Sequence, residues 1–211
     1  MLYVLDLDDT LYLERDFVRS GFQAVYDYLN EQNIASSFYN TAWQLFQAGV
    51  RHNVFNQALD KEQIKFDNRL IEKLVDIYRH HTPDIRLAID ADEFLADHQN
   101  DQLALITDGN AAAQWNKINA LELKKYFTSI IVTDDYGRDY WKPDQRVFEK
   151  VQGDKPPENC VHIADNPAKD FIAPRELGWR NSIRIRRPLS LHEDLPTPSD
   201  CREVERLGKV H

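Results

Sequence analysis

Several acidic residues, with a threonine and a lysine, occur in short polar clusters beside apolar runs of the sequence. Carboxylates that gather around one point can bind a divalent cation, attack as nucleophiles or transfer protons. A lysine among them would balance their charge, and a hydroxyl could bind an anionic group. The residues concerned are Asp6, Asp8, Thr107, Lys142, Asp165 and Asp170.

Short apolar runs predict the strands that would position these residues. Between most of the runs lie segments with a helical pattern, at 110–121, 143–151 and 167–177, and Pro143 and Pro167 suit a first helical turn. Strands that alternate with helices predict an α/β fold with a doubly wound parallel sheet. The predicted strands are 2–7, 103–107, 129–133, 161–164 and 182–185.

The carboxyl ends of such strands are where open α/β sheets bind their ligands. Asp6 and Asp8 lie at the end of the first run, Thr107 ends the second, and Asp165 follows the fourth. We therefore expect these side chains to meet at one edge of the sheet.

About ninety residues separate the first two strands, where a short crossover would suffice. Apolar positions in this interval follow helical spacing, for example Phe22, Val25 and Leu29. The pattern predicts a helical cap over 13–85, followed by a helix near 92–98, and a discontinuous core of residues 1–12 and 86–211.

The ordered motifs resemble the haloacid dehalogenase superfamily, in its phosphatase type with a helical cap between the first and second motifs. The resemblance rests on Asp-x-Asp-x-Thr from Asp6 to Thr10, then Thr107, Lys142 before a helix, and Asp165 with Asp170 five residues on. It implies a Rossmann-like core and a hydrolase that forms an aspartyl-phosphate.

The resemblance also implies a role for each motif residue. Asp6 would be the nucleophile and Asp8 the general acid and base, with Thr107 and Lys142 as further catalytic groups. The family often places substrate-facing groups where the chain enters the cap, so the resemblance implies this role for Tyr12, Arg15 and Arg19. The substrate-binding set would be Thr107, Asp108, Gly109, Asn110 and Lys142; the Mg²⁺ ligands would be Asp6, the backbone carbonyl of Asp8, Asp165 and Asp170.

Each motif taken alone has a simpler interpretation. Asp8 and Asp9 could be turn residues, Thr107 to Asn110 a turn and helix cap, and Lys142 a solvated charge. Several functions also stay open. A phosphomutase would keep Asp6 and Asp8, a binding or regulatory module would keep the fold without turnover, and a dehalogenase has no need of the acid that Asp8 supplies.

Composition limits the class of protein. The chain has 211 residues, 42% of them hydrophobic, with a net charge of −9 and two cysteines without metal-ligand spacing. These features predict a soluble cytoplasmic protein that binds neither nucleic acid nor membrane. The resemblance implies that its partner is a small phosphorylated metabolite, and we expect a monomer or homodimer. We interpret the basic run 184–187 as a solvated strand end and the tail as ending in a short helix capped by Ser199.

Overall fold

The computed structural model describes residues 1–34 and 37–210. The chain forms two compact units. The sheet unit consists of Met1–Arg15 with Ile85–His211, and the helical unit of Asp16–Asp84. Within the described ranges, no helix has both the length and the apolar character that crossing a membrane requires.

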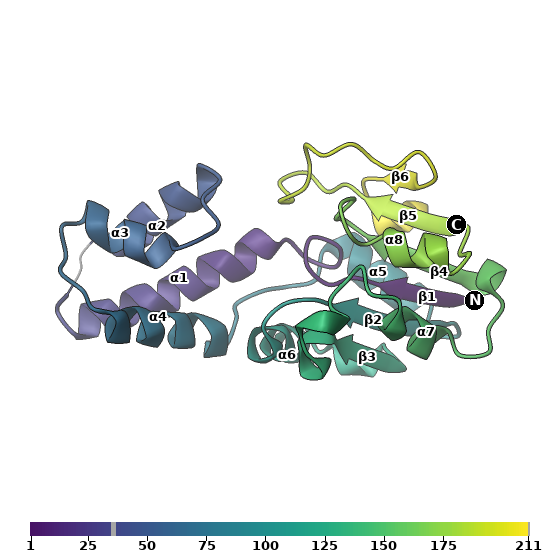
Figure 1. Cartoon of the computed structure of the whole chain (residues 1–211), viewed down its shortest axis with the longest axis horizontal. Helices are drawn as coiled ribbons and strands as arrows, with labels where there is room; N and C mark the ends of the chain where they lie inside the picture. Colours follow the sequence, from purple (N-terminus) through teal and green to yellow (C-terminus); the bar gives the residue numbers. More distant parts are fainter. Residues whose placement is uncertain (35–36, 211) are drawn as a thin grey trace. The chain divides into compact units, whose positions relative to one another are not determined.

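The sheet unit is built on six parallel strands, which confirms the predicted α/β class (Figure 1). The strand order is β3-β2-β1-β4-β5-β6, so β1 lies inside the sheet with β2 and β4 as neighbours. Their bounds are β1 Leu2–Leu5, β2 Gln102–Thr107, β3 Ser129–Val132, β4 Cys160–Ala164, β5 Asn181–Ile185 and β6 Arg202–Val204.

The register of the central strands brings distant residues to one edge. Leu5 at the end of β1 pairs with Leu105 of β2 and with Ile163 of β4. The backbone N–H of Asp6 continues the pairing by donating to the carbonyl of Ile163 at 2.9 Å. Because all three strands run the same way, the residues that follow them converge beyond their carboxyl ends.

Apolar side chains on the strands and helices form the core of the sheet unit. Val4, Ile106 and Ile131 from three strands are buried together with Phe148 and Trp179. The helices of this unit are α5 Ile89–Asp97, α6 Ala111–Ala120, α7 Arg146–Gln152 and α8 Ile172–Glu176, with 3₁₀ turns η1 Leu123–Lys125, η2 Thr133–Tyr136, η3 Arg138–Tyr140, η4 Pro157–Asn159 and η5 Leu207–Lys209.

The helical unit contains α1 Glu14–Glu31, which begins in the sheet unit, α2 Phe38–Gln47, α3 Val54–Lys61 and α4 Asn68–His80. Its core is aromatic: the ring of Phe22 lies 6.4 Å from Phe46, 6.1 Å from Phe55 and 6.0 Å from Tyr78, centroid to centroid. The spacing of apolar residues along α1 thus buries one face of that helix against the other three.

Two helices begin later than predicted. The structure starts α7 at Arg146, not at Pro143, and the Asp144 carboxylate accepts a hydrogen bond from the Arg146 N–H at 3.0 Å. Residues 167–171 form turns, and α8 begins only at Ile172. Side chains satisfy the backbone there, because Asn166 accepts from the Ala168 N–H and Asp170 from the Asn166 N–H, each at 3.0 Å.

Two expectations for the end of the chain were wrong. The segment after Ser199 adds β6 to the sheet beside β5 and forms no helix at its start. The basic run is not solvated, since Arg184 is 1% and Arg187 is 6% exposed. Arg184 donates to the carbonyls of Asp165, His192 and Leu195, which offer buried acceptors that sequence periodicity cannot reveal.

We predict that Gly21→Ala destabilises the helical unit. Alanine in an exposed helix interior gains about 1 kcal/mol over glycine. At position 21, however, a Cβ would lie 2.5 Å from two ring carbons of Tyr78. Overpacking of this kind costs roughly 1–3 kcal/mol, so the clash should outweigh the propensity gain in chemical denaturation. Asn30→Ala, at an exposed position of the same helix, is the control and should not destabilise; a Gly21→Ala protein more stable than wild type would contradict the packing.

Candidate active site

A pocket of about 170 Å³ opens beyond the carboxyl ends of the central strands. Every residue around it belongs to the sheet unit. They come from the loops after β1, β2 and β4, from the start of α1, and from the segments around Trp141 and His192. The lining residues are Asp6, Asp8, Glu14, Asp108, Gly109, Trp141, Asp165, Asn166, Lys169, Asp170 and His192.

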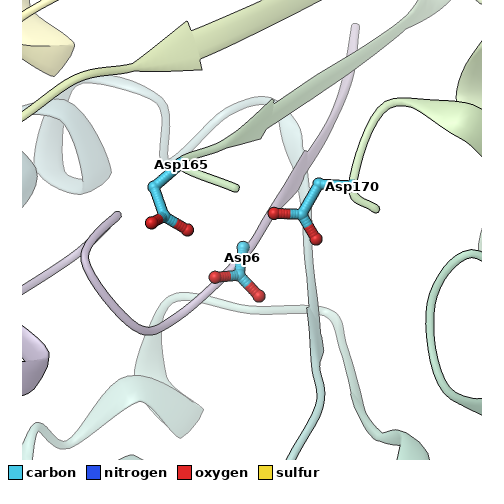
Figure 2. Close-up of side chains that lie close together, drawn as sticks. All are labelled: Asp6, Asp165 and Asp170. Atoms are coloured by element: carbon cyan, nitrogen blue, oxygen red, sulfur yellow. The ribbon is translucent and has the colours of Figure 1, made fainter. Parts of the chain in front are cut away.

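Three carboxylates meet at this edge, as Figure 2 shows. Asp6, Asp165 and Asp170 each place one carboxylate oxygen within 4.8 Å of the others, and all three side chains are buried. Burial, reinforced by the neighbouring charges of Asp6 and Asp170, raises the pKa of Asp165 well above its usual range. The cluster therefore carries more negative charge than its surroundings balance.

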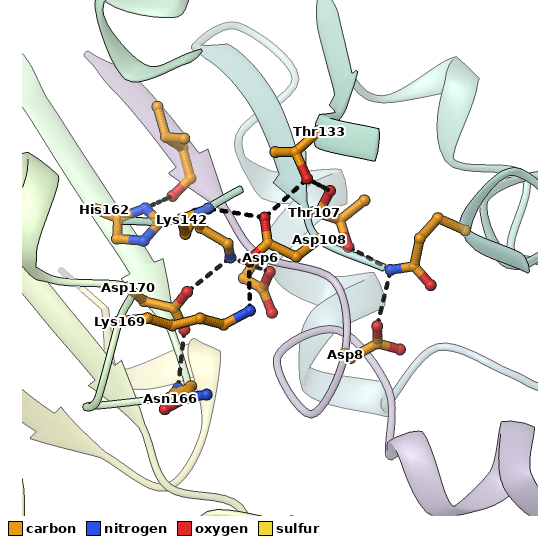
Figure 3. A network of polar contacts seen from close by, with 12 residues as sticks. Asp6, Asp8, Thr107, Asp108, Thr133, Lys142, His162, Asn166, Lys169 and Asp170 are labelled. Carbon is orange, nitrogen blue, oxygen red and sulfur yellow. Dashed lines mark hydrogen bonds and ion pairs between the residues drawn. The ribbon is translucent and has the colours of Figure 1, made fainter. Parts of the chain in front are cut away.

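Lys142 supplies part of the balance. Its Nζ lies 2.5 Å from Asp6 Oδ1 and 2.7 Å from Asp170 Oδ1, and its side chain is completely buried (Figure 3). Although burial disfavours the ammonium, the charges of Asp170 and Asp6 hold the pKa of Lys142 well above its ordinary value. Burial still raises the pKa of Asp6 to about 7, because one lysine is shared between two acids.

The geometry fits a divalent cation bound by these acids. Asp165 Oδ2 is buried and has no hydrogen-bond partner among residues 1–34 and 37–210. A buried carboxylate oxygen without a partner is costly, and a hard cation with oxygen ligands would satisfy it. A further cation would also relieve the repulsion that raises the pKa values of Asp6 and Asp165.

Asp108 organises the loop after β2. Its carboxylate accepts hydrogen bonds from Thr133 Oγ1 at 2.9 Å and from the backbone N–H of Lys142 at 3.1 Å, and it pairs with Lys169 Nζ at 2.5 Å. Figure 3 shows these contacts joining three loops around the pocket. The Asp108 carboxylate therefore links neighbouring loops, in addition to the turn that we predicted for this residue.

Asp8 lies in a separate set of contacts. Lys117 Nζ is 2.7 Å from its Oδ1 and 3.0 Å from its Oδ2, Gln114 Nε2 donates to Oδ2 at 2.9 Å, and the Tyr12 hydroxyl donates to Oδ1. Burial favours the neutral acid, but the charge and hydrogen bond of Lys117 and the hydrogen bonds from Tyr12 and Gln114 hold the pKa of Asp8 below its usual range. These contacts therefore favour the carboxylate form of Asp8, and its side chain is not part of the three-acid cluster. Tyr12 is buried against Asp8 instead of facing the pocket.

The remaining predicted residues lie close to the pocket in different ways. Gly109 and Asp108 line it, whereas Thr107 and Lys142 are buried and do not. Thr107 Oγ1 accepts a hydrogen bond from Gln114 Nε2 at 2.5 Å. Asn110 is also absent from the lining, and its side chain caps α6 by accepting from the Ala113 N–H at 3.3 Å. Binding of substrate by Asn110 stays a prediction.

Sequence reasoning assigned no role to several residues at the site, among them Asn166 and Lys169, which line the pocket after β4. Gln114 and Lys117 are three apart on α6, so they share a helix face, and that spacing after Thr107 was the available signal. Glu14 lines the pocket, and its burial together with the charge of Asp8 raises its pKa to about 8. His192 comes from the tail, and no local pattern indicates that it reaches the pocket.

Buried polar contacts hold the tail beside the site. Asp9, whose φ of 54° is left-handed, accepts from the N–H of Glu14 at 2.9 Å and of Leu191 at 2.7 Å. Arg187 donates twice to the Thr10 carbonyl and pairs with Asp90 at 2.8 Å. Asp9, which we interpreted as a simple turn residue, thus joins the loop after β1 to the segment that carries His192.

Comparison with known proteins agrees with this geometry. The family model described as "Haloacid dehalogenase-like hydrolase" matches residues 3–181. The chain belongs to this family, which confirms the resemblance seen in its motifs.

Curated relatives match over short segments. The chain is 38% identical over 47 residues to the Rhythmically expressed gene 2 protein of Drosophila melanogaster, covering 20% of this chain and 18% of that protein. It is 31% identical over 78 residues to the glyceraldehyde 3-phosphate phosphatase of Pyrococcus furiosus, covering 36% of this chain and 32% of the relative. The matches thus span less than a third of either relative's length.

Solved structures share the fold over nearly the whole chain. YfnB of Bacillus subtilis, bound to magnesium, superposes with a TM-score of 0.69 at 18% identity, covering 99% of this chain and 96% of that one. CbbY of Rhodobacter sphaeroides, in complex with phosphate, gives 0.64 at 15% identity, covering 99% and 95%. At these identities the similarity establishes the fold alone.

We predict that Mg²⁺ binding releases protons and depends on Asp165. Burial raises the pKa of Asp6 to about 7, so this acid is partly protonated near pH 7, and the pKa of Asp165 is raised as well. A metal ligand must lose its proton. Calorimetric titration at pH 7 should therefore give binding enthalpies that differ between PIPES and Tris, with affinity rising as pH rises through 7.

Asp165→Asn should abolish binding. It should also raise the melting temperature of the metal-free protein, because it removes a buried acid that neighbouring carboxylates repel. Asp200→Asn, at an exposed ion pair, is the control; equal enthalpies in the two buffers would refute the proton release.

Proposed function

We propose that the protein is a Mg²⁺-dependent phosphomonoester hydrolase that acts on a small phosphorylated metabolite through an aspartyl-phosphate on Asp6. One observation carries this proposal. The Asp6 carboxylate, in contact with Lys142 and clustered with Asp165 and Asp170, lines the same pocket as Asp8. A nucleophile, cation ligands and a proton-transfer group thus border one small space.

In the first step Asp6 attacks the phosphorus of the substrate. A bond forms between Asp6 Oδ and phosphorus while the bond from phosphorus to the ester oxygen breaks. The leaving alkoxide takes a proton from Asp8, which has to be in its acid form at this stage. The alcohol is released, and the phosphoryl group stays on Asp6.

In the second step water hydrolyses the aspartyl-phosphate. Asp8, now a carboxylate, takes a proton from the water as its oxygen bonds to phosphorus, and the bond to Asp6 Oδ breaks. Phosphate leaves, and Asp6 and the protonated Asp8 are restored. The contacts with Lys117, Gln114 and Tyr12 favour the carboxylate form that this step requires.

Positive charge makes the attack of one anion on another feasible. Lys142 would hold Asp6 in place and offset the charge of the phosphoryl group. Lys169, a third exposed and paired with Asp108, also lines the pocket and would add positive charge beside the phosphoryl group. Asp6, the Asp8 carbonyl, Asp165 and Asp170 would hold Mg²⁺, which would neutralise phosphoryl charge when bound.

The substrate class is supported by the relatives. One matched relative is named for glyceraldehyde 3-phosphate, and a structure of CbbY with the same fold is in complex with xylulose-(1,5)bisphosphate. The pocket of about 170 Å³ suits a phosphoryl group with little else, so the rest of the substrate would extend beyond it. We propose that the helical unit is the cap domain that the motif order predicts.

A phosphomutase is the second candidate. One structural neighbour, a beta-phosphoglucomutase candidate from Thermotoga maritima, superposes with a TM-score of 0.65. Such an enzyme would pass the phosphoryl group from Asp6 to a second sugar hydroxyl instead of to water. Product analysis separates the two, since a mutase yields an isomerised sugar phosphate and a hydrolase yields free phosphate.

We predict that the wild-type protein releases phosphate from members of a metabolite panel only when Mg²⁺ is present. The panel includes glyceraldehyde 3-phosphate, sugar phosphates and nucleotides, and phosphate is measured colorimetrically with Mg²⁺ or EDTA. Asp6→Asn should reduce the rate to background because the amide cannot form the acyl phosphate. Asp8→Asn should lower kcat about 10²–10⁴-fold, the usual contribution of general acid and base catalysis.

Asp144→Asn, at a surface ion pair with Arg146, is the matched control and should keep wild-type activity. Phosphate release that survives in Asp6→Asn would rule out the mechanism. If the wild-type protein released phosphate from no member of the panel, the result would favour a binding or regulatory module.

A further inference from the structure

The Asp8 carboxylate is held by more side chains than a turn or cap requires. Lys117 contacts both of its oxygens, and Gln114 and Tyr12 each donate to one of them. Lys117 is 4% exposed, and Gln114 and Tyr12 are each 1% exposed. The carboxylate is thereby fixed in one orientation while it still lines the pocket.

The two residues on α6 occupy positions that a helix normally fills with apolar side chains. They lie on the buried side of α6 together with Ala113 and Ile118. A buried ammonium is costly unless it is paired, and an apolar residue of similar size often stabilises a core at least as well. Packing alone therefore gives no reason for a lysine and a glutamine here.

Gln114 connects two of the predicted catalytic groups. Its side-chain amide has two N–H donors, and Nε2 lies 2.9 Å from Asp8 Oδ2 and 2.5 Å from Thr107 Oγ1. One amide group therefore sets the separation between Asp8, after β1, and Thr107, at the end of β2. Lys117 fixes the direction of the same carboxylate through its two contacts.

We propose that Lys117 and Gln114 are positioning residues for Asp8. They orient the Asp8 carboxylate toward the atoms with which it exchanges protons. The inference rests on the proposed function and adds two residues to it. Neither side chain lines the pocket, so neither touches the substrate there. Both act through Asp8, and Gln114 also acts through Thr107.

The two steps of the reaction depend on Asp8 to different degrees. A nitrophenolate leaving group departs without a proton, so p-nitrophenyl phosphate can phosphorylate Asp6 without help from Asp8. An alkyl phosphate needs the proton, and hydrolysis of the aspartyl-phosphate needs Asp8 as base for either substrate. A misoriented Asp8 carboxylate should therefore slow only the second step when the substrate is p-nitrophenyl phosphate.

The experiment uses Lys117→Met in the full chain, with p-nitrophenyl phosphate and Mg²⁺ in rapid mixing. We expect the burst of nitrophenolate to keep its rate within a few-fold of wild type while the steady-state rate falls about 10²-fold. The ratio of burst rate to steady-state rate should accordingly rise. KM should fall together with kcat, because kcat/KM reports the first step, which is unchanged. Lys125→Met removes the same charge from an exposed ion pair and should leave both phases as in wild type.

A double-mutant cycle tests whether Lys117 acts through Asp8. In the Asp8→Asn background, Lys117→Met should lower the steady-state rate by less than threefold, because the group that it positions is already gone. Equal losses in both backgrounds, or a burst slowed as much as the steady state, would overturn the proposal. If Lys117→Met does not fold, Gln114→Met goes through the same cycle with the same two outcomes.

Failure of this inference is distinguishable from failure of the proposed function. An active wild type with an inactive Asp6→Asn protein and an additive cycle would overturn only the positioning role. A wild type without phosphatase activity would overturn both.

Discussion

The structure depends on keeping several carboxylates close together in a buried place at one edge of a parallel sheet. The parallel register of the strands brings Asp6, Asp165 and Asp170 together beyond the carboxyl ends of these strands. Acids in such surroundings repel one another and lose hydration, which raises the pKa values of Asp6 and Asp165. The fold tolerates this because Lys142 contacts two of the three acids, and the unpartnered oxygen of Asp165 leaves a place suited to a cation.

Charge around the pocket is divided between two groups of residues. The three-acid cluster has Lys142 as its direct partner and is left with excess negative charge, the condition that favours a divalent metal and a reactive carboxylate. Asp8 is balanced separately by Lys117 and by two neutral donors. Two carboxylates two residues apart thus have opposite environments, and pKa values shifted in opposite directions, which is the usual physical basis for different chemical roles.

The end of the chain contributes to the same site through buried arginines. Arg184 binds the carbonyl of Asp165 on one side and two carbonyls of the tail on the other. Asp9 and Arg187 link the tail to the loop that carries Asp6 and Asp8. These contacts bring His192 to the pocket, so the tail takes part in shaping the space in which substrate would bind.

The sequence by itself determined the parallel sheet, because short apolar runs alternating with helical segments have few other solutions, and it determined which acids follow which strands. That was enough to predict the meeting of Asp6 with Asp165. Only the tertiary structure decided which cation pairs with which acid, for example Lys117 with Asp8. It also decided that residues 167–171 form turns and that the last segment adds β6 to the sheet. Local periodicity records whether a residue is apolar, whereas the partner of a buried charge depends on residues a hundred positions away.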